Sequence, residues 1–144
     1  MKSFKLTRLT GLSENDHALI KGLARITLGD FFEIDPLHDY WVVFDEEDTP
    51  VGFAGMHIND MAETPYAFLS WCGVLKEARG NGLQKKLIQA RLRYGRRKGM
   101  TRFVTYTSPS NVPSANNLIR CGFMRYTPLI EYGVENASYW IRNF

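Results

Sequence analysis

A nearly continuous apolar run is the feature that most restricts the fold of this chain. The run covers residues 66–75, which is too short for most helices, and it is apolar on both faces, as a buried central strand is. A segment with helical periodicity follows over residues 83–98, and a second strand pattern covers residues 102–107. A strand, a helix and a strand in this order require a parallel pair joined by a crossover helix. We therefore expect an α/β fold.

Five further segments have the patterns of β-strands. Each one alternates apolar and polar residues or is rich in β-branched and aromatic residues. They are residues 4–9, 40–45, 51–58, 123–130 and 138–144. A polar turn that ends at Pro50 separates the second of these segments from the third, and it predicts an antiparallel hairpin.

Capping residues predict where the other helices begin. Ser13 stands before acidic residues in the next turn, so a helix is expected over residues 13–22. Apolar residues continue at three- and four-residue steps, which predicts that this helix continues or restarts toward Leu28. A last short helix is expected to begin near Pro113 and to end at Gly122.

Length and composition restrict the class of protein. A chain of 144 residues predicts one domain over residues 1–144. No apolar run reaches the roughly 18–20 residues of a membrane span, and basic residues interrupt the N-terminus where a signal peptide would be apolar. Cys72 and Cys121 lie far apart and have no cysteine or histidine partner set, so no disulfide framework or metal site is predicted. We expect a soluble, cytoplasmic protein that binds no membrane.

The net charge of +3 conceals a division along the chain. Residues 1–77 have a formal charge of −7, whereas residues 78–130 contain eleven Lys and Arg and no acidic residue. Such a stretch favours a polyanionic ligand, a nucleic acid or an acidic surface as partner, although solvated basic helix faces would produce the same pattern. The acidic first part could meet a cation.

The junction between residues 66–75 and the following helix carries the chemistry. The segment Arg79-Gly80-Asn81-Gly82 leads directly into the basic helix. A glycine turn before a helix aims backbone amides and the positive end of the helix dipole at one point, and glycine lets the main chain approach a ligand closely. This arrangement predicts a phosphate-binding loop. It is neither a dinucleotide fingerprint nor a P-loop, because the third glycine and the Gly-Lys-Ser/Thr sequence are missing.

These residues resemble the GNAT superfamily of acyl-CoA-dependent N-acyltransferases. The family signature Arg/Gln-x-x-Gly-x-Gly/Ala begins five residues after a strand valine, and here residues 79–84 begin five residues after Val74. Gln84 departs from the signature, because it stands where the family has a small residue. A second family signature, Asn followed eleven residues later by Gly-Phe, is met by Asn111 and residues 122–123.

The resemblance implies a fold and an acetyl-CoA site. The implied fold is a mixed, mostly antiparallel seven-stranded sheet with a central, splayed parallel strand pair and four flanking helices, and acyl-CoA would enter where that pair splays apart. Backbone groups of β-strand residues would contact the pantetheine arm, loop and helix amides would bind the pyrophosphate, and the next helix would hold the pantetheine. In that order these residues are Cys72, Gly73 and Val74; Arg79, Gly80, Asn81, Gly82, Leu83, Gln84 and Lys85; and Asn111 and Ser114.

The catalytic groups are harder to assign. Many family members use a Tyr seven residues after the motif Asn to protonate the leaving thiolate, but Leu118 occupies that position here. Tyr106, with Tyr126 behind it, or a water molecule is our substitute acid, although Tyr106 could equally be a core aromatic residue. His57 is our candidate base, since histidine is a common general base, and it could act with Asp60 through water, or it could be an ordinary hydrogen-bonded histidine.

Acidic residues suggest how the acceptor is recognised. In this family His38 would line the acceptor mouth, and the nearby Asp35 and Asp39 could bind a cationic amine, although loop solvation explains them equally well. We expect an N-acetyltransferase that moves an acetyl group from acetyl-CoA to a primary amine of a small molecule or a protein. The alternatives are a non-catalytic acyl-CoA-binding relative and a basic nucleic-acid-binding module. A homodimer is an open alternative to a monomer.

Overall fold

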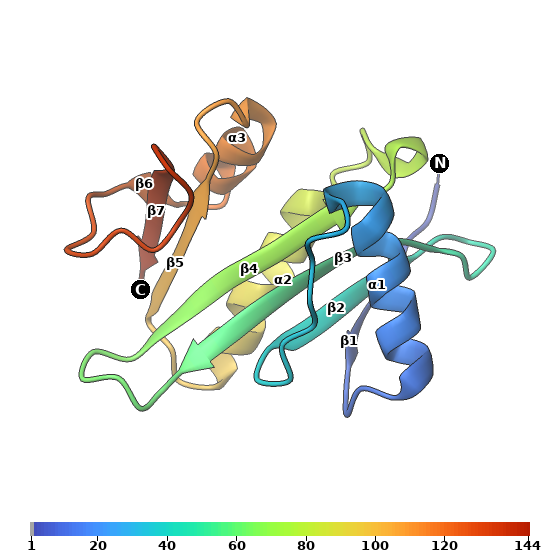
Figure 1. Ribbon diagram of the computed structural model, residues 1–144, viewed down its shortest axis with the longest axis horizontal. Coiled ribbons are helices and arrows are strands. Elements are labelled where there is room, and N and C mark those ends of the chain that lie inside the picture. The colour runs from blue at the N-terminus through green and yellow to red at the C-terminus, as the bar shows by residue number, and fades with distance from the viewer. Residues whose placement is uncertain (1) are drawn as a thin grey trace. The chain divides into compact units, whose positions relative to one another are not determined.

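The computed structural model describes residues 2–144, whose elements are shown in Figure 1. The strands are β1 (Lys5–Leu9), β2 (Asp39–Phe44), β3 (Pro50–Asn59), β4 (Tyr66–Val74), β5 (Arg102–Thr107), β6 (Met124–Arg125) and β7 (Ser138–Asn143). The helices are α1 (Glu14–Leu28), α2 (Leu83–Arg97), α3 (Val112–Arg120) and the short 3₁₀ helix η1 (Lys76–Ala78).

The strands form one seven-stranded mixed sheet in the order β1-β2-β3-β4-β5-β7-β6. Strands β4 and β5 run parallel, with Ala67 opposite Phe103 and Phe68 opposite Val104. The pairs β1–β2, β2–β3, β5–β7 and β6–β7 are antiparallel. The predicted mixed sheet and its parallel pair around α2 are therefore confirmed.

The prediction of four flanking helices is wrong, because the described chain has three α-helices. The segment expected to continue or restart toward Leu28 continues as the single helix α1, which begins with a capping box between Ser13 and Asp16. Its apolar stripe of Ile20, Leu23 and Ala24 passes residue 22 without interruption, so packing holds the helix together over its full length. Within residues 2–144 no helix is both long enough and apolar enough to cross a membrane.

The strand predicted over residues 123–130 is also mostly wrong. Only Met124 and Arg125 belong to β6, although the N–H of Tyr126 still donates to the carbonyl of Tyr139 at 3.1 Å. Pro128 has no N–H to donate to a ladder. The apolar residues Leu129 and Ile130 are 106% and 81% exposed, so the apolar pattern that predicted the strand has no core to face.

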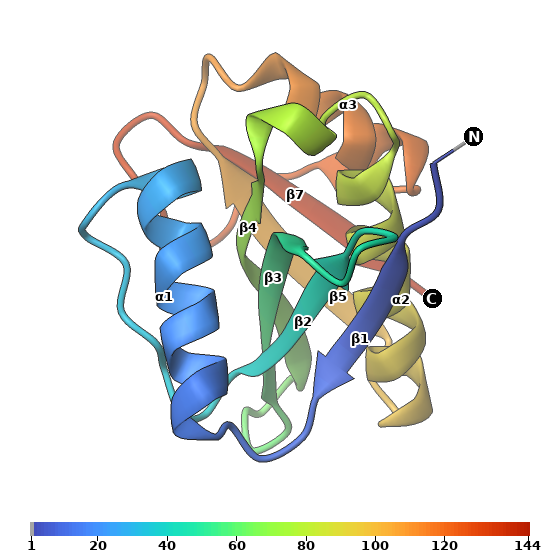
Figure 2. The ribbon, with the colours of Figure 1, turned by 90° about the vertical axis from the view of Figure 1, so that its right-hand side faces the viewer.

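Contacts divide the chain into two compact units. The first contains the residues up to His57 together with Ser70–Leu87. In it, α1 packs on one face of the antiparallel strands β1 to β3, as Figure 2 shows. Its core is made of buried aliphatic and aromatic side chains: Ile20, Leu23, Ala24, Phe32, Tyr40, Val42 and Phe53.

The second unit contains Ile58–Leu69 and Ile88–Phe144. Strand β7 pairs with β5 over its whole length, from Ser138 opposite Thr107 to Asn143 opposite Arg102. Thr105 donates its hydroxyl hydrogen to the carbonyl of Leu69 at 2.7 Å, which ties β5 to the start of β4. This unit therefore holds the parallel pair in register.

Candidate functional site

The loop between β4 and α2 has the backbone that the glycine motif predicts. Gly80 and Gly82 have φ angles of +82° and +70°, in the left-handed region that favours glycine. Both residues are exposed, and a Cβ atom built on either one would meet nothing within 4 Å. The main chain therefore borders open space at this point.

Side chains of the same loop hold it in shape. Nε of Arg79 donates to the carbonyl of Val74 at 3.3 Å, and Nδ2 of Asn81 donates to the carbonyl of Ala78 at 2.9 Å. The N–H of Arg79 bonds to the carbonyl of Lys76 at 3.3 Å and closes η1. Arg79 and Asn81 therefore connect the end of β4 to the glycine turn.

The N–H groups of the next four residues differ from that of Arg79. Within residues 2–144, the N–H groups of Gly80, Asn81, Gly82 and Leu83 form no backbone hydrogen bond. The N–H of Lys86, in the first turn of α2, bonds to the carbonyl of Gly82 at 3.1 Å. The first turn of α2 contains no acidic residue, so nothing there opposes the positive end of its dipole. A phosphate group fits this donor set.

Close packing against α1 constrains the β4 residues before this loop. Gly73 is buried, and a Cβ atom on it would lie 2.1 Å from Oγ1 of Thr27 and 3.0 Å from a ring carbon of Phe53. Its glycine is therefore needed for packing against α1. Cys72 is partly buried beside it. The expected contact of Cys72, Gly73 and Val74 with pantetheine stays a prediction.

A polar cluster lies a few residues earlier on β4, in the same unit. Nδ1 of His38 lies 3.1 Å from Oγ of Ser70, and Nε2 of His38 lies 3.4 Å from Oδ2 of Asp35. His57 stacks on His38 with ring centroids 5.3 Å apart, and its Nδ1 lies 3.5 Å from the carbonyl oxygen of Leu37. Two histidines, a hydroxyl and a carboxylate thus meet at one place.

The charge state of His38 follows from this environment. Burial is the largest influence and lowers the pKa of His38 below its ordinary value of 6.5. The carboxylates of Asp35 and Asp39 raise that pKa, and His57 lowers it. His38 is therefore neutral at pH 7 and can accept a proton.

The acids expected to bind a cationic acceptor are both engaged inside the first unit. Asp35 faces His38, and its Oδ1 accepts a hydrogen bond from the N–H of Leu37 at 2.9 Å. Asp39 lies 3.7 Å from Nη1 of Arg8 on the neighbouring strand β1. Their binding of an acceptor stays a prediction, and Asp60 is exposed after the end of β3.

Tyr106, the expected acid, lies in the second unit among aromatic rings. It stacks on Phe68 with centroids 6.1 Å apart and meets Tyr132 edge to face at 6.0 Å. Its hydroxyl forms no hydrogen bond with any part of the chain that the structure describes. Tyr106 is only partly buried, so this hydroxyl is available as a proton donor.

Tyr126, expected behind Tyr106, contacts a different tyrosine. Its hydroxyl lies 2.8 Å from that of Tyr132, and Tyr132 donates to the carbonyl of Thr105 at 3.3 Å. Burial and the hydrogen bond to Tyr126 raise the pKa of Tyr132 far above its ordinary value of 10. Tyr132 therefore stays protonated.

The second motif lies on α3. Asn111 is the N-cap of this helix, and its Oδ1 accepts a hydrogen bond from the N–H of Ser114 at 3.3 Å. Leu118 is buried on the same helix. The motif asparagine is thus used to begin α3, and its contact and that of Ser114 with pantetheine stay predictions.

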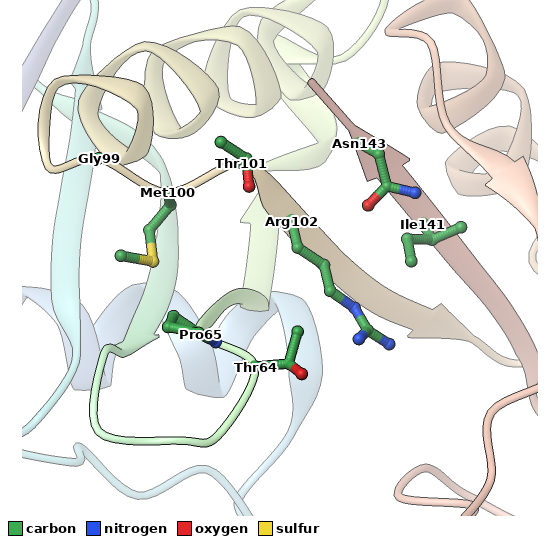
Figure 3. A pocket seen from close by; sticks show the side chains of 8 residues that line it. All are labelled: Thr64, Pro65, Gly99, Met100, Thr101, Arg102, Ile141 and Asn143. Atoms are coloured by element: carbon green, nitrogen blue, oxygen red, sulfur yellow. The ribbon is translucent and has the colours of Figure 1, made fainter.

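The pocket in Figure 3 does not belong to the predicted site. It has a volume of about 510 Å³ and lies at the amino ends of β4 and β5 in the second unit. Its lining is Thr64, Pro65, Gly99, Met100, Thr101, Arg102, Ile141 and Asn143. No residue that the sequence marked as catalytic or ligand-binding is among them.

Two functional candidates escaped the sequence analysis. Ser70 is a single polar residue within the apolar run 66–75, and Tyr132 lies between the segments 123–130 and 138–144 that were predicted as strands. A hydroxyl inside an otherwise apolar strand was a usable signal for Ser70, because a buried polar group needs a partner. Nothing in the sequence pairs Ser70 with His38, since 32 positions separate them.

Comparison with known proteins gives the family. The model of the family described as acetyltransferase (GNAT) matches residues 11–123, which is most of the chain and includes the loop between β4 and α2. The chain therefore belongs to the GNAT acetyltransferase family.

One relative of known activity is similar to part of the chain. Mycothiol acetyltransferase of Arthrobacter sp. (strain FB24) is 39% identical over 66 residues, which are 46% of this chain and 20% of that protein. The chain thus matches about a fifth of the length of this relative.

Solved structures share the fold across the whole chain. A chain of the NatC complex bound to Gag peptide and CoA has a TM-score of 0.79 at 19% identity, with 98% of each chain covered. IAA acetyltransferase from Bacillus cereus ATCC 14579 has a TM-score of 0.76 at 16% identity, with 99% of this chain and 100% of that chain covered.

Proposed function

We propose that this protein is an N-acetyltransferase that transfers an acetyl group from acetyl-CoA to a primary amine by direct attack in a ternary complex. The observation that carries the proposal is the glycine turn before the positive end of α2, where the main chain borders open space at Gly80 and Gly82 and the N–H groups of residues 80–83 form no backbone hydrogen bond within residues 2–144. Membership of the GNAT acetyltransferase family supports it.

The residues present fit acetyl-CoA. Its pyrophosphate requires N–H donors, and the N–H groups of residues 80–83 together with a first turn of α2 without acidic residues support its binding here. The eleven basic residues and the absence of acids over residues 78–130 favour the three phosphate groups of CoA. The structurally similar NatC chain comes from a complex that contains CoA and a peptide, which supports the same ligand class here.

The thioester of acetyl-CoA supplies the activated acyl group. A neutral amine attacks the thioester carbonyl, and by resemblance a backbone N–H of β4 near Gly73 or Val74 polarises that carbonyl. Holding amine and thioester in line replaces a bimolecular encounter by an effectively intramolecular one. This chain must also remove a proton from the amine and return one to the thiolate that leaves.

Tyr106 is our proposed donor to the thiolate, with water as the alternative. The observation in its favour is a partly buried phenol whose hydroxyl has no hydrogen-bond partner in residues 2–144. Leu118, at the position of the usual family tyrosine, is a buried hydrocarbon and can donate nothing. His57 is the base candidate taken from the sequence, and it stacks on the better buried His38.

A thiol-release screen tests the proposal. The protein is incubated with acetyl-CoA and amines of several classes, namely peptides with free N-termini, lysine peptides, polyamines, aminoglycosides and small metabolites. We expect CoA release that depends on one class of amine, with the acetylated amine detected by mass spectrometry. Saturable acetyl-CoA binding without release for any amine would instead favour a non-catalytic acyl-CoA-binding protein.

A further inference from the structure

Three side chains of the first unit form a line that ends on β4. Oγ of Ser70 lies 3.1 Å from Nδ1 of His38, and Oδ2 of Asp35 lies 3.4 Å from Nε2 of the same ring. A carboxylate can only accept, so Nε2 carries the ring proton that points toward Asp35. In the neutral ring Nδ1 is then the acceptor, and the Ser70 hydroxyl donates to it.

The local structure holds each member of this line. Asp35 is fixed by the N–H of Leu37, which donates to its side chain, and by the hydroxyl of Tyr40, which accepts from its backbone N–H at 3.1 Å. The N–H of His38 bonds to the carbonyl of Asp35 at 3.1 Å and closes the turn between them. These hydrogen bonds hold Asp35 and His38 in one turn.

A glycine on the neighbouring strand leaves space for the serine. A Cβ atom on Gly55 would lie 2.7 Å from Oγ of Ser70 and 3.1 Å from the ring of Tyr40. Any larger residue at position 55 would push the hydroxyl of Ser70 away from its present position. The side chain of His38 is only 12% exposed, so water competes little for its nitrogen atoms.

We propose that Ser70 carries the proton of the acceptor amine to His38, with Asp35 orienting the imidazole. This inference rests on the proposed acetyl transfer and names its proton acceptor. Ser70 lies two residues before Cys72 on the same strand, so it is about 7 Å along the chain from the backbone that would hold pantetheine. In this relay Ser70 contacts the acceptor amine, and His38 acts through Ser70.

The proton transfers balance as follows. The amine nitrogen forms a bond to the acyl carbon, and the bond between that carbon and sulfur breaks. The proton lost by the nitrogen goes to Oγ of Ser70, while the hydroxyl proton of Ser70 goes to Nδ1 of His38. His38 becomes an imidazolium whose Nε2–H faces the carboxylate of Asp35. The sulfur leaves as a thiolate, which takes its proton from Tyr106 or water.

The electrostatic environment permits this acceptor role. Burial keeps His38 neutral by lowering its pKa below 6.5, so Nδ1 is unprotonated before the reaction. The charged and titratable groups that face His38 are Asp35 from the preceding loop, Asp39 and Tyr40 from β2, and His57 from β3. Asp35 stabilises the imidazolium when it forms.

Three variants and one control test the relay. Ser70→Ala removes the carrier, His38→Gln removes the acceptor, and Gly55→Ala displaces the Ser70 hydroxyl. His17→Gln, on α1, is the control for the loss of a histidine. With an amine found by the thiol-release screen, we expect each of the three to lower kcat about 100-fold, the low end of what a positioned general base contributes, with acetyl-CoA binding retained. The control should keep the wild-type kcat.

Two further readouts separate the relay from a structural role. The rise of kcat with pH should have its midpoint at the pKa that NMR gives for His38, and this midpoint should be absent in His38→Gln. The His38 midpoint in NMR should also change in Ser70→Ala. A wild-type kcat and pH profile in Ser70→Ala would overturn the relay while acetyl transfer stands. A stable acetyl group on Ser70 after acetyl-CoA alone would overturn it too, and a wild type that acetylates no amine would overturn both proposals.

Discussion

A Cβ atom on Gly73 would lie 2.1 Å from Oγ1 of Thr27, so α1 and β4 meet where one of them has no side chain. Thr27 is held in place by its hydroxyl, which donates to the carbonyl of Leu23 at 2.7 Å. The helix α1, which contributes to the first unit's core, thereby packs closely against β4, the strand that leads into the glycine loop before α2.

Gly73→Ala should therefore destabilise the protein. The added methyl group forces α1 or β4 to shift, and overpacking of this kind costs about 1–3 kcal/mol. Urea unfolding measures the free energy of unfolding. Gly22→Ala is the matched control, because a Cβ atom there meets nothing within 4 Å, and a helical glycine replaced by alanine gains about 0.5–1 kcal/mol. Equal stability of wild type and Gly73→Ala would contradict the close packing.

Stability should depend on pH through His38. Its pKa is lowered on folding, so the unfolded chain binds more protons between the lowered value and 6.5, and stability rises with pH across that window. The free energy of unfolding, measured by urea at a series of pH values, should increase up to about pH 6.5 in the wild type. His38→Gln should flatten this dependence, and an unchanged slope in that variant would assign the effect to another group.

The two nearby carboxylates should act unequally on His38. Asp35 raises the pKa of His38 more than Asp39 does, so Asp35→Asn should lower the NMR titration midpoint of His38 by more than Asp39→Asn. Asp39 has Arg8 as a partner at 3.7 Å, which reduces its influence further. A larger shift in Asp39→Asn would show that Asp35 is not the orienting group.

Removing the hydroxyl of Tyr106 and removing that of Tyr132 should affect stability and kcat differently. Tyr106→Phe removes a hydroxyl without a partner in residues 2–144, so stability should stay within about 0.5 kcal/mol of wild type while kcat falls. Tyr132→Phe removes the bonds to Thr105 and Tyr126, and it should cost about 1 kcal/mol. Urea unfolding and acetyl transfer, measured on both variants, check the pair. A Tyr106→Phe enzyme with wild-type kcat would leave water as the acid.

The sequence was most informative where local patterns and tertiary packing agree. Residues 66–75, 83–98 and 102–107 predicted β4, α2 and β5 almost to the residue, because a buried strand and an amphipathic helix each have one strong periodicity. The pattern failed at residues 123–130, where apolar residues alternate without a core to cover them. Whether such a segment forms a strand depends on its burial in the folded chain, and the local sequence does not determine that burial.

The candidate site shows the same division. The glycine turn before α2 was predicted because its conformation is set by neighbouring residues. The contact between His38 and Ser70 joins residues 32 positions apart, the first just before β2 and the second on β4. Only the strand order β2-β3-β4 and the absence of a side chain at Gly55 bring them together. Pairs of this kind require the fold before they can be recognised.

Calorimetric titration of acetyl-CoA into Gly82→Asp tests the central claim most directly. An aspartate at position 82 puts a carboxylate into the open space before α2, where it repels the pyrophosphate, and the account predicts no measurable binding. Gly99→Asp is the matched control, since Gly99 has a φ angle of +86°, meets nothing within 4 Å and follows the other end of the same helix. It should bind acetyl-CoA like the wild type. Equal binding by Gly82→Asp and wild type would contradict the assignment of the phosphate site.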